Sequence, residues 1–291
     1  MIKSISPKDL PIGELHGLLL GAVSPRPIAF ASTIDVDGNV NLSPFSFFNV
    51  FSANPPIMIF SPARRVRGNT TKHTLENAMA TKEVVINIVN YAMVQQMSLA
   101  SAEYGQGVNE FDKAGFTEVP SETVAPPRVG ESPVSFECKV NNIIHLGTEG
   151  GAGNLIICEV TKIHLNTNIL DDNGKIDPNK IDTVARMGGN WYSRASGDSI
   201  FEIPKPISTI GIGIDNIPAS IKDSKVLTGN ELGQLGTIIS LPEPSIPSQN
   251  EEVISIIASD SNVEERLHQL AKGHLAKNDV AKAWEVLMAN K

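Results

Sequence analysis

Residues 24–74 read SPRPIAFASTIDVDGNVNLSPFSFFNVFSANPPIMIFSPARRVRGNTTKHT, and this stretch decides the fold. Its apolar segment 28–34 predicts a strand that runs into Asp37-Gly38, a pair that favours the tight turn of a hairpin. A second strand is predicted from Val40 onward. After a break at the prolines Pro55-Pro56, the short apolar run 57–60 predicts a fully buried strand.

The rest of the first two hundred residues continues this pattern of many strands and few helices. Strands are predicted over 83–89, 134–146 and 155–165, and helices over 71–80, with Thr71 as N-cap, and over 91–103. The glycine-rich segment 147–154 lacks the Gly-Lys-Ser/Thr ending of a phosphate loop and joins two strands, which favours a hairpin turn. A closed or nearly closed antiparallel barrel would leave such strands without exposed edges.

Composition limits the function. The 291 residues carry a formal net charge of −8 and a pI near 5.3, which argues against a general nucleic-acid binder. No apolar run approaches the roughly 18 residues that cross a bilayer, and residues 1–10 lack the apolar centre of a signal peptide. We therefore expect a cytoplasmic protein without a membrane partner. Cys138 and Cys158 stand in strand contexts, where we expect them to be apolar core residues rather than redox or metal groups.

A change in character near residue 200 predicts two domains, 1–200 and 201–291. Proline-rich segments at 203–206 and 241–247 precede a charged helical pattern over 263–288. The apolar positions of that pattern suit a helical hairpin packed on the barrel or on a partner subunit. The sequence does not indicate what this extension does.

The segment before the first predicted helix carries chemistry suited to a phosphate. A phosphate needs hydroxyls, cations and backbone N–H groups that converge from one side, and a helix N-terminus supplies the N–H groups. The hydroxyl and cationic residues of this segment are Ser61, Arg64, Arg65, Arg67, Thr70, Thr71, Lys72 and Thr74. The alternative is a solvated basic loop.

Residues 43–49, which precede this phosphate-type segment, suit a flat heteroaromatic ring. Ser43, Ser46 and Asn49 alternate with three phenylalanines, Phe45, Phe47 and Phe48. Such a mixture presents an apolar slot with polar groups aimed at a ring edge. The alternative is a strand with an ordinary aromatic core face.

Ten blocks of this chain resemble flavin reductase-like proteins of the FMN-binding split-barrel class, over roughly residues 20–195. The blocks are Pro25-Arg26-Pro27-Ile28-Ala29-Phe30, Asp37-Gly38, Ser43-Pro44-Phe45-Ser46-Phe47-Phe48-Asn49, Asn54-Pro55-Pro56, Ser61-Pro62, Lys72-His73-Thr74-Leu75, Glu110-Phe111, Ala114-Gly115, Pro126-Pro127-Arg128-Val129 and Arg186-Met187-Gly188-Gly189. The resemblance implies a mainly β protein, an FMN-binding split β-barrel with flanking helices. The C-terminal extension, largely helical, lies outside it.

The resemblance also implies roles for individual residues. It places Ser61, Lys72 and Thr74 near the FMN phosphate, and His164 near the flavin or the incoming nicotinamide as the candidate catalytic residue, although a lone histidine is often structural. Glu110 and Phe111 would flank the pocket, and the segment 186–192 would lie over the cofactor of a dimer. The predicted cofactor-binding residues are Arg26, Pro27, Ser43, Phe45, Ser46, Phe47, Asn49, Ser61, Arg64, Thr70, Thr71, Lys72, Thr74, Phe111 and Trp191, and no metal site is predicted.

The leading hypothesis is a homodimeric flavoprotein oxidoreductase that accepts hydride from NADH or NADPH on FMN and reduces flavin or another small acceptor. No GxGxxG fingerprint is present, so the nicotinamide would bind transiently against the flavin rather than in a dinucleotide-binding domain. A second hypothesis is an FMN-binding electron carrier without nicotinamide turnover. A third is a structural or interaction module built on a barrel without flavin.

Overall fold

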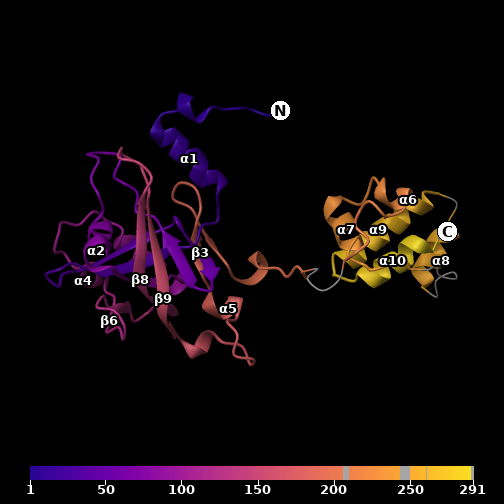
Figure 1. The fold of residues 1–291 in the computed structure, drawn as a ribbon. Coiled ribbons are helices and arrows are strands. Elements are labelled where there is room, and N and C mark those ends of the chain that lie inside the picture. Colours follow the sequence, from indigo (N-terminus) through magenta and orange to yellow (C-terminus); the bar gives the residue numbers. More distant parts are fainter. Residues whose placement is uncertain (206–209, 243–249, 260, 290–291) are drawn as a thin grey trace. The chain divides into compact units, whose positions relative to one another are not determined.

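The computed structural model describes residues 1–205, 210–242, 250–259 and 261–289. The chain forms two compact units, Met1–Phe201 and Glu202–Lys291 (Figure 1). Part of the two proline-rich segments, Pro206 and residues 243–247, lies outside the described residues.

A seven-stranded antiparallel sheet forms the body of the first unit. In spatial order its strands are β2 (Val40–Phe45), β1 (Ala29–Ile34), β5 (Glu83–Ile88), β8 (Val134–His145), β9 (Asn154–Leu165), β4 (Pro56–Phe60) and β3 (Phe48–Ala53). The two edge strands, β2 and β3, are joined by only Ser46 and Phe47. Three Cα steps span at most about 11 Å, so the two edges of the sheet must meet at this corner. The sheet therefore curves into a barrel that is open along one seam, which confirms the predicted antiparallel barrel.

Short elements flank the barrel. Two ribbons pair β6 (Glu118–Val119) with β7 (Arg128–Val129), and β10 (Val184–Arg186) with β11 (Tyr192–Arg194). The helices of this unit are α1 (Ile12–Ala22), α2 (His73–Thr81), α3 (Val94–Leu99), α4 (Glu110–Ala114) and α5 (Pro178–Ile181), with 3₁₀ turns η1 (Pro7–Asp9), η2 (Tyr91–Met93), η3 (Thr167–Ile169) and η4 (Gly197–Ser199).

Both faces of the sheet are covered at β1. Along β1, Ala29 and Ala31 point into an inner core inside the barrel, whereas Phe30 points into an outer core beneath α3 and α4. Alternation of this kind explains why β1 is buried over almost its whole length. Cys138 and Cys158 are free, buried thiols of the inner core, which confirms their expected apolar role; burial raises the pKa of Cys138 to about 12.

Local structure agrees with most of the predicted elements. The turn between β1 and β2 forms as expected: Asp35 Oδ1 accepts from the backbone N of Asn39 (2.8 Å), and Gly38 takes φ +91°. Helix α2 begins two residues later than predicted, because the Thr71 hydroxyl bonds the side chain of Glu76 instead of capping the helix. The helix predicted over 91–103 is wrong in length: η2 and α3 end at Leu99.

The second unit is helical. It contains α6 (Ala219–Lys222), α7 (Gly229–Leu235), α8 (Glu251–Ile257), α9 (Val263–Leu275) and α10 (Val280–Met288). Helices α9 and α10 form the predicted hairpin, and their apolar side chains pack in a core within this unit around Trp284, whose Nε1 donates to Leu235 O (3.0 Å). No helix of the described segments is long and apolar enough to span a bilayer.

Candidate functional site

Residues 61–74, which link β4 to α2, are clamped against neighbouring strands. Ser61 is 7% exposed; its backbone N donates to Phe47 O (2.9 Å), and its Oγ accepts from the backbone N of Asn154 (3.0 Å). The backbone N of Arg64 donates to Ala152 O (2.8 Å). The segment is therefore held between the β2–β3 corner and the start of β9.

Glycines in the β8–β9 turn allow this close approach. A Cβ at Gly153 would lie 2.8 Å from Ser61 Oγ, and one at Gly150 would lie 2.9 Å from the carbonyl oxygen of Val66. The glycine-rich turn was predicted only as a hairpin, and the structure shows that it also packs against the 61–74 segment. Larger residues would push the two loops apart.

Asn154 ties the two loops together and was not among the predicted site residues. It is 2% exposed; its Nδ2 donates to Pro62 O (2.8 Å), and its Oδ1 lies 2.6 Å from His145 Nδ1. A signal in the sequence was an asparagine at the start of a strand, directly after the glycine-rich Gly150-Gly151-Ala152-Gly153. Its importance depends on a contact ninety residues distant in the chain, which no local pattern encodes.

Two cations of the 61–74 segment, Arg65 and Lys72, share one acidic partner, and a third, Arg64, is held within the segment. Arg65 Nε lies 2.8 Å and Lys72 Nζ 3.4 Å from the same carboxylate oxygen of Glu103, while Arg64 Nε donates to Asn69 Oδ1 (2.7 Å). The hydrogen bond from Arg65 and the charge of Lys72 lower the pKa of Glu103. Arg65 and Lys72 are thus already paired with an acid, Glu103, which the sequence analysis did not predict as part of the site.

Hydroxyls and a helix N-terminus lie on the same segment. Thr70 Oγ1 accepts from Arg65 (3.1 Å), and the buried Thr74 Oγ1 accepts from Asn41 Nδ2 (2.9 Å) at the start of β2. Helix α2 begins at His73, and the first turn of a helix carries N–H groups without partners in the helix, with partial positive charge. Cations, hydroxyls and amide donors together are a donor set that fits a phosphate monoester dianion.

Arg26 brings three further segments together. This arginine is 5% exposed, and its guanidinium donates to Val23 O (2.5 Å) at the end of α1 and to Met187 O (2.9 Å). Its Nε lies 3.5 Å from Ser46 Oγ in the β2–β3 corner. Burial and the charge of Arg186 lower the pKa of Arg26. Arg26 therefore places the segment 186–192 beside the β2–β3 corner. Pro27, the next residue in the chain, is exposed and precedes β1.

The remaining residues of the corner divide between core and surface. Phe45 lies in the inner core, with its ring 5.5 Å from that of Phe60. Ser43 is half-buried, and Phe47 and Asn49 are exposed. The single strand implied by the alternation of polar and aromatic residues is in fact two strands, because the chain turns at Ser46 and Phe47 and begins β3. Phe47 and Asn49 therefore lie at the surface, and Phe47 contacts the 61–74 segment through the hydrogen bond from the backbone N of Ser61.

Three predicted residues lie elsewhere. His164 lies ten residues after Asn154 on β9, which corresponds to about 33 Å along a strand. Phe111 is fully buried in the outer core, and Trp191 is 74% exposed in the turn between β10 and β11. The structure therefore does not bring His164 to the 61–74 segment.

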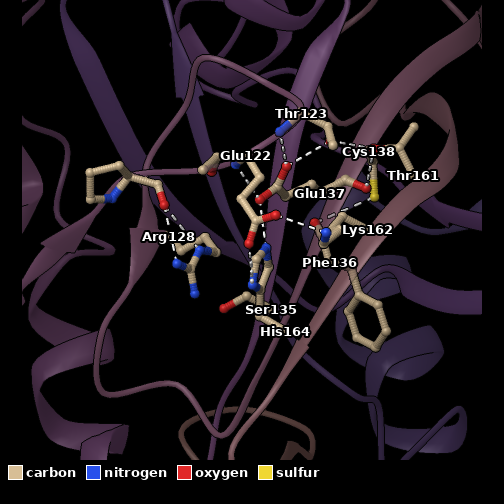
Figure 2. A network of polar contacts seen from close by, with 12 residues as sticks. Glu122, Thr123, Arg128, Ser135, Phe136, Glu137, Cys138, Thr161, Lys162 and His164 are labelled. Atoms are coloured by element: carbon tan, nitrogen blue, oxygen red, sulfur yellow. Dashed lines mark hydrogen bonds and ion pairs between the residues drawn. The ribbon is translucent and has the colours of Figure 1, made fainter.

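His164 instead belongs to a network around a buried carboxylate (Figure 2). Glu137 is fully buried and accepts from the backbone N atoms of Glu122 (2.8 Å) and Thr123 (2.5 Å), from Thr123 Oγ1 (2.6 Å) and from His164 Nε2 (2.6 Å). Burial acts to raise the pKa of Glu137, but these hydrogen bonds outweigh it and lower the pKa to about 2. The network fastens the loop around Thr123 to the outer face of the sheet.

Glu110 has a comparable anchoring contact. Its carboxylate is buried and accepts from the backbone N of Leu42 (2.9 Å), and burial raises its pKa. Glu110 and Phe111, predicted to flank the pocket, thus join α4 to β2. The neighbouring residue, Asn41, donates a hydrogen bond to Thr74 and so joins the same part of β2 to α2.

The fold defines the class, an antiparallel split barrel, in which residues 61–74 carry cations, hydroxyls and the start of α2 on one segment at a barrel corner. Residues 21–179, more than half of the chain, match the model of the flavin reductase like domain family, and the chain belongs to that family. A relative from Aquifex aeolicus without an assigned function is 39% identical over 191 residues, which are 66% of this chain and 95% of the relative. The family match ends before the second unit begins.

Solved structures agree with this assignment. The nitrilotriacetate monooxygenase component B from Bacillus cereus is 28% identical, with a TM-score of 0.65 over 70% of this chain and 99% of that one. A putative flavin reductase with split barrel domain from Shewanella frigidimarina is also 28% identical, with a TM-score of 0.58 over 68% of this chain and 96% of that one. The protein is therefore a flavin-related oxidoreductase of the split-barrel type.

Proposed function

We propose that this protein binds FMN, accepts hydride from NADH or NADPH, and delivers the electrons to free flavin, a ferric complex or another small acceptor. The observation that supports the proposal is that cations, hydroxyls and a helix N-terminus all belong to residues 61–74, a segment that Asn154 holds at the barrel corner. Membership of the flavin reductase like domain family supports flavin as the cofactor.

Within the proposal each group has a defined task. Lys72 and Arg65 neutralise the phosphate, and the hydroxyls of Ser61 and Thr70 with the first N–H groups of α2 orient it. Ser46 and Asn49 offer polar groups to the ring edge, and Arg26 fixes the corner on which they stand. Bound FMN would supply the hydride and electron chemistry. The protein positions the cofactor and excludes water, and no side chain is required as a proton donor.

A homodimer is part of the proposal. Helix α1 buries none of its side chains and exposes Leu18 and Leu19, and the edge strand β3 exposes Val50 and Phe51. Exposed apolar groups on an edge strand and an adjacent helix favour association. In such a dimer the exposed Trp191 would lie over the partner's cofactor. A cytoplasmic location also belongs to the proposal, because the nicotinamide donors are held inside the cell.

The test is an absorption spectrum of the purified protein with and without added FMN, followed by NADH and NADPH without oxygen. Flavin bands that bleach with a nicotinamide are expected. Lys72→Ala should bind FMN about tenfold more weakly because it removes one charged phosphate partner, whereas the exposed Lys113→Ala on α4 should not.

Other outcomes would decide against parts of the proposal. Bands that bleach under photoreduction but persist with both nicotinamides would indicate an electron carrier. Colourless protein that fails to bind added FMN would refute the cofactor assignment. Light scattering that reports a monomer at micromolar concentration would refute the dimer.

A further inference from the structure

A groove lies between α8 and α9 of the second unit, outside the part of the chain that matches the flavin reductase family. It has a volume of about 600 Å³, within the range of ligand-binding clefts. Its apolar lining, here called the floor, consists of the buried Ile256, the half-buried Leu270 and the exposed Gly273, and the exposed Ser255 and Gln269 supply polar groups. An apolar floor with a polar rim suits a ligand that buries one or two apolar groups.

The charge of the groove contrasts with that of the protein. Arg266 and Lys277 line it together with His274, against a single acid, Glu252. The whole chain carries a net charge of −8. Among the residues that the structure describes, neither Arg266 nor Lys277 forms a salt bridge. Arg266 donates to Ser259 Oγ (2.6 Å), which holds its guanidinium at the turn that follows α8. The groove therefore favours an anionic ligand.

Gly273 is a separate indication. It lies inside α9, where glycine is a poorer helix former than alanine. A Cβ at this position would meet no atom within 4 Å, so packing in the described parts of the chain does not require glycine. A glycine on the floor of a groove lets a ligand approach the helix backbone. Such an approach would explain why glycine stands here although it destabilises the helix.

The positions of the cations and the apolar lining between them indicate the kind of anion. Arg266 lies in α9 and Lys277 two residues beyond its last residue, Leu275, so about 16 Å of chain axis separates the two positions at about 1.5 Å per residue. A ligand that meets both cations and also covers the apolar lining must carry negative charge at two places and an apolar group between them. An extended peptide of about five residues covers that length at about 3.3 Å per residue. We propose that this groove binds an acidic peptide segment of a partner protein, with carboxylates toward Arg266 and Lys277 and an apolar side chain on the floor near Gly273. The proposal does not depend on the flavin site.

The test uses the full-length protein and an array of heptapeptides with a central leucine and glutamates at varied positions on either side. Matched peptides carry glutamine in place of glutamate. The strongest binders are then measured by fluorescence anisotropy. Glutamine peptides should bind at least about tenfold more weakly, as expected when complementary charges are removed from a groove.

Two pairs of variants separate binding from folding. Gly273→Leu fills the groove, and its control Gly233→Leu alters a glycine that also lies two residues before the end of its helix, α7, with open space around it. Lys277→Glu reverses a groove charge, and Lys225→Glu reverses an exposed charge outside it. The groove variants should lose at least about tenfold in affinity, whereas the controls stay within about twofold. In a Trp191→Phe background, Trp284 fluorescence on heating should show that all four variants fold.

Several results would overturn the proposal. One is that the wild-type protein retains none of the acidic peptides. Others are equal retention of the glutamine peptides, or undiminished affinity in a folded Gly273→Leu variant. Displacement of a bound peptide by inorganic phosphate, but not by chloride at equal ionic strength, would identify a small-anion site instead.

Discussion

Replacement of Glu137 by glutamine should destabilise the first unit strongly, although the two side chains have nearly the same shape. The carboxylate of Glu137 accepts four hydrogen bonds, from Glu122, Thr123 (twice) and His164 (Figure 2). Glutamine keeps one acceptor oxygen but turns an NH2 group toward donors that need an acceptor. At least one backbone N–H of the buried loop then loses its partner.

The size of the effect follows from the pKa of Glu137. Its fall from an ordinary value of 4.5 to about 2 shows how strongly the folded state favours the charged carboxylate. At 1.36 kcal/mol for each pKa unit, this corresponds to about 3 kcal/mol of the free energy of unfolding. Because the folded-state pKa is the lower one, this stabilisation is complete above pH 4.5 and is lost as the pH falls from 4.5 toward 2.

Urea unfolding measured at neutral pH and at several pH values between 5 and 2 tests this. Far-UV circular dichroism follows the β-rich first unit, and fluorescence in a Trp191→Phe background follows Trp284 of the second unit as an internal control. The Glu137→Gln variant should lose about 3 kcal/mol at neutral pH. It should also lack the part of the acid destabilisation that belongs to Glu137, so wild type and variant should converge toward pH 2.

Glu122→Gln is the matched control in the same loop. Glu122 is exposed and pairs with Lys162 (2.7 Å), and ion pairs between exposed side chains contribute little to stability because water and salt screen them. A loss below 1 kcal/mol in Glu137→Gln, or a difference from wild type that stays constant from pH 5 to pH 2, would refute the reasoning.

Three further predictions concern the barrel. Glu103→Gln should raise FMN affinity a few-fold in titrations by flavin fluorescence, because it frees Arg65 and Lys72 from a competing carboxylate; unchanged or weaker binding would contradict this. Asn154→Ala should lower the free energy of unfolding by about 1–3 kcal/mol in urea titrations, because the Pro62 carbonyl and the His145 side chain lose a buried partner, and a change within error would count against the clamp. Cys138, with a thiol pKa near 12 and full burial, should resist iodoacetamide at pH 8 in the folded protein and react only after denaturation, as mass spectrometry can show.

The strands that the sequence predicted correctly carry a local signal. The apolar segment of β1, the Asp-Gly turn at Gly38 and the apolar residues of β8 and β9 are each signals carried by residues that lie close together in the chain. Hydrophobic periodicity and turn chemistry suffice to define such elements. The first and last residues of the elements were predicted less well. Thr71 is a good N-cap by type, but its hydroxyl bonds Glu76 in the folded protein.

The candidate site was predicted only in part. The hydroxyls and cations of residues 61–74 stand close together in the sequence, so their grouping could be read directly. Asn154 and Glu103 reach that segment from other elements. His164 was assigned by resemblance, yet its ring bonds Glu137 because β8 and β9 pair in the register that sets Ser135 opposite His164. A one-residue change of register would turn His164 to the other face.

The sequence by itself determined most strands of the large sheet, the hairpin turns, the split-barrel family and the grouping of cations and hydroxyls in residues 61–74. Each of these depends on residues that lie near one another in the chain or on motifs of fixed spacing. Only the tertiary structure decided that the β2 and β3 edges meet, that Asn154 clamps Ser61, and that Arg26 joins α1 to the segment after β10. These contacts join residues that are far apart in the chain, so burial and register, which are properties of the whole fold, select the partner of each side chain.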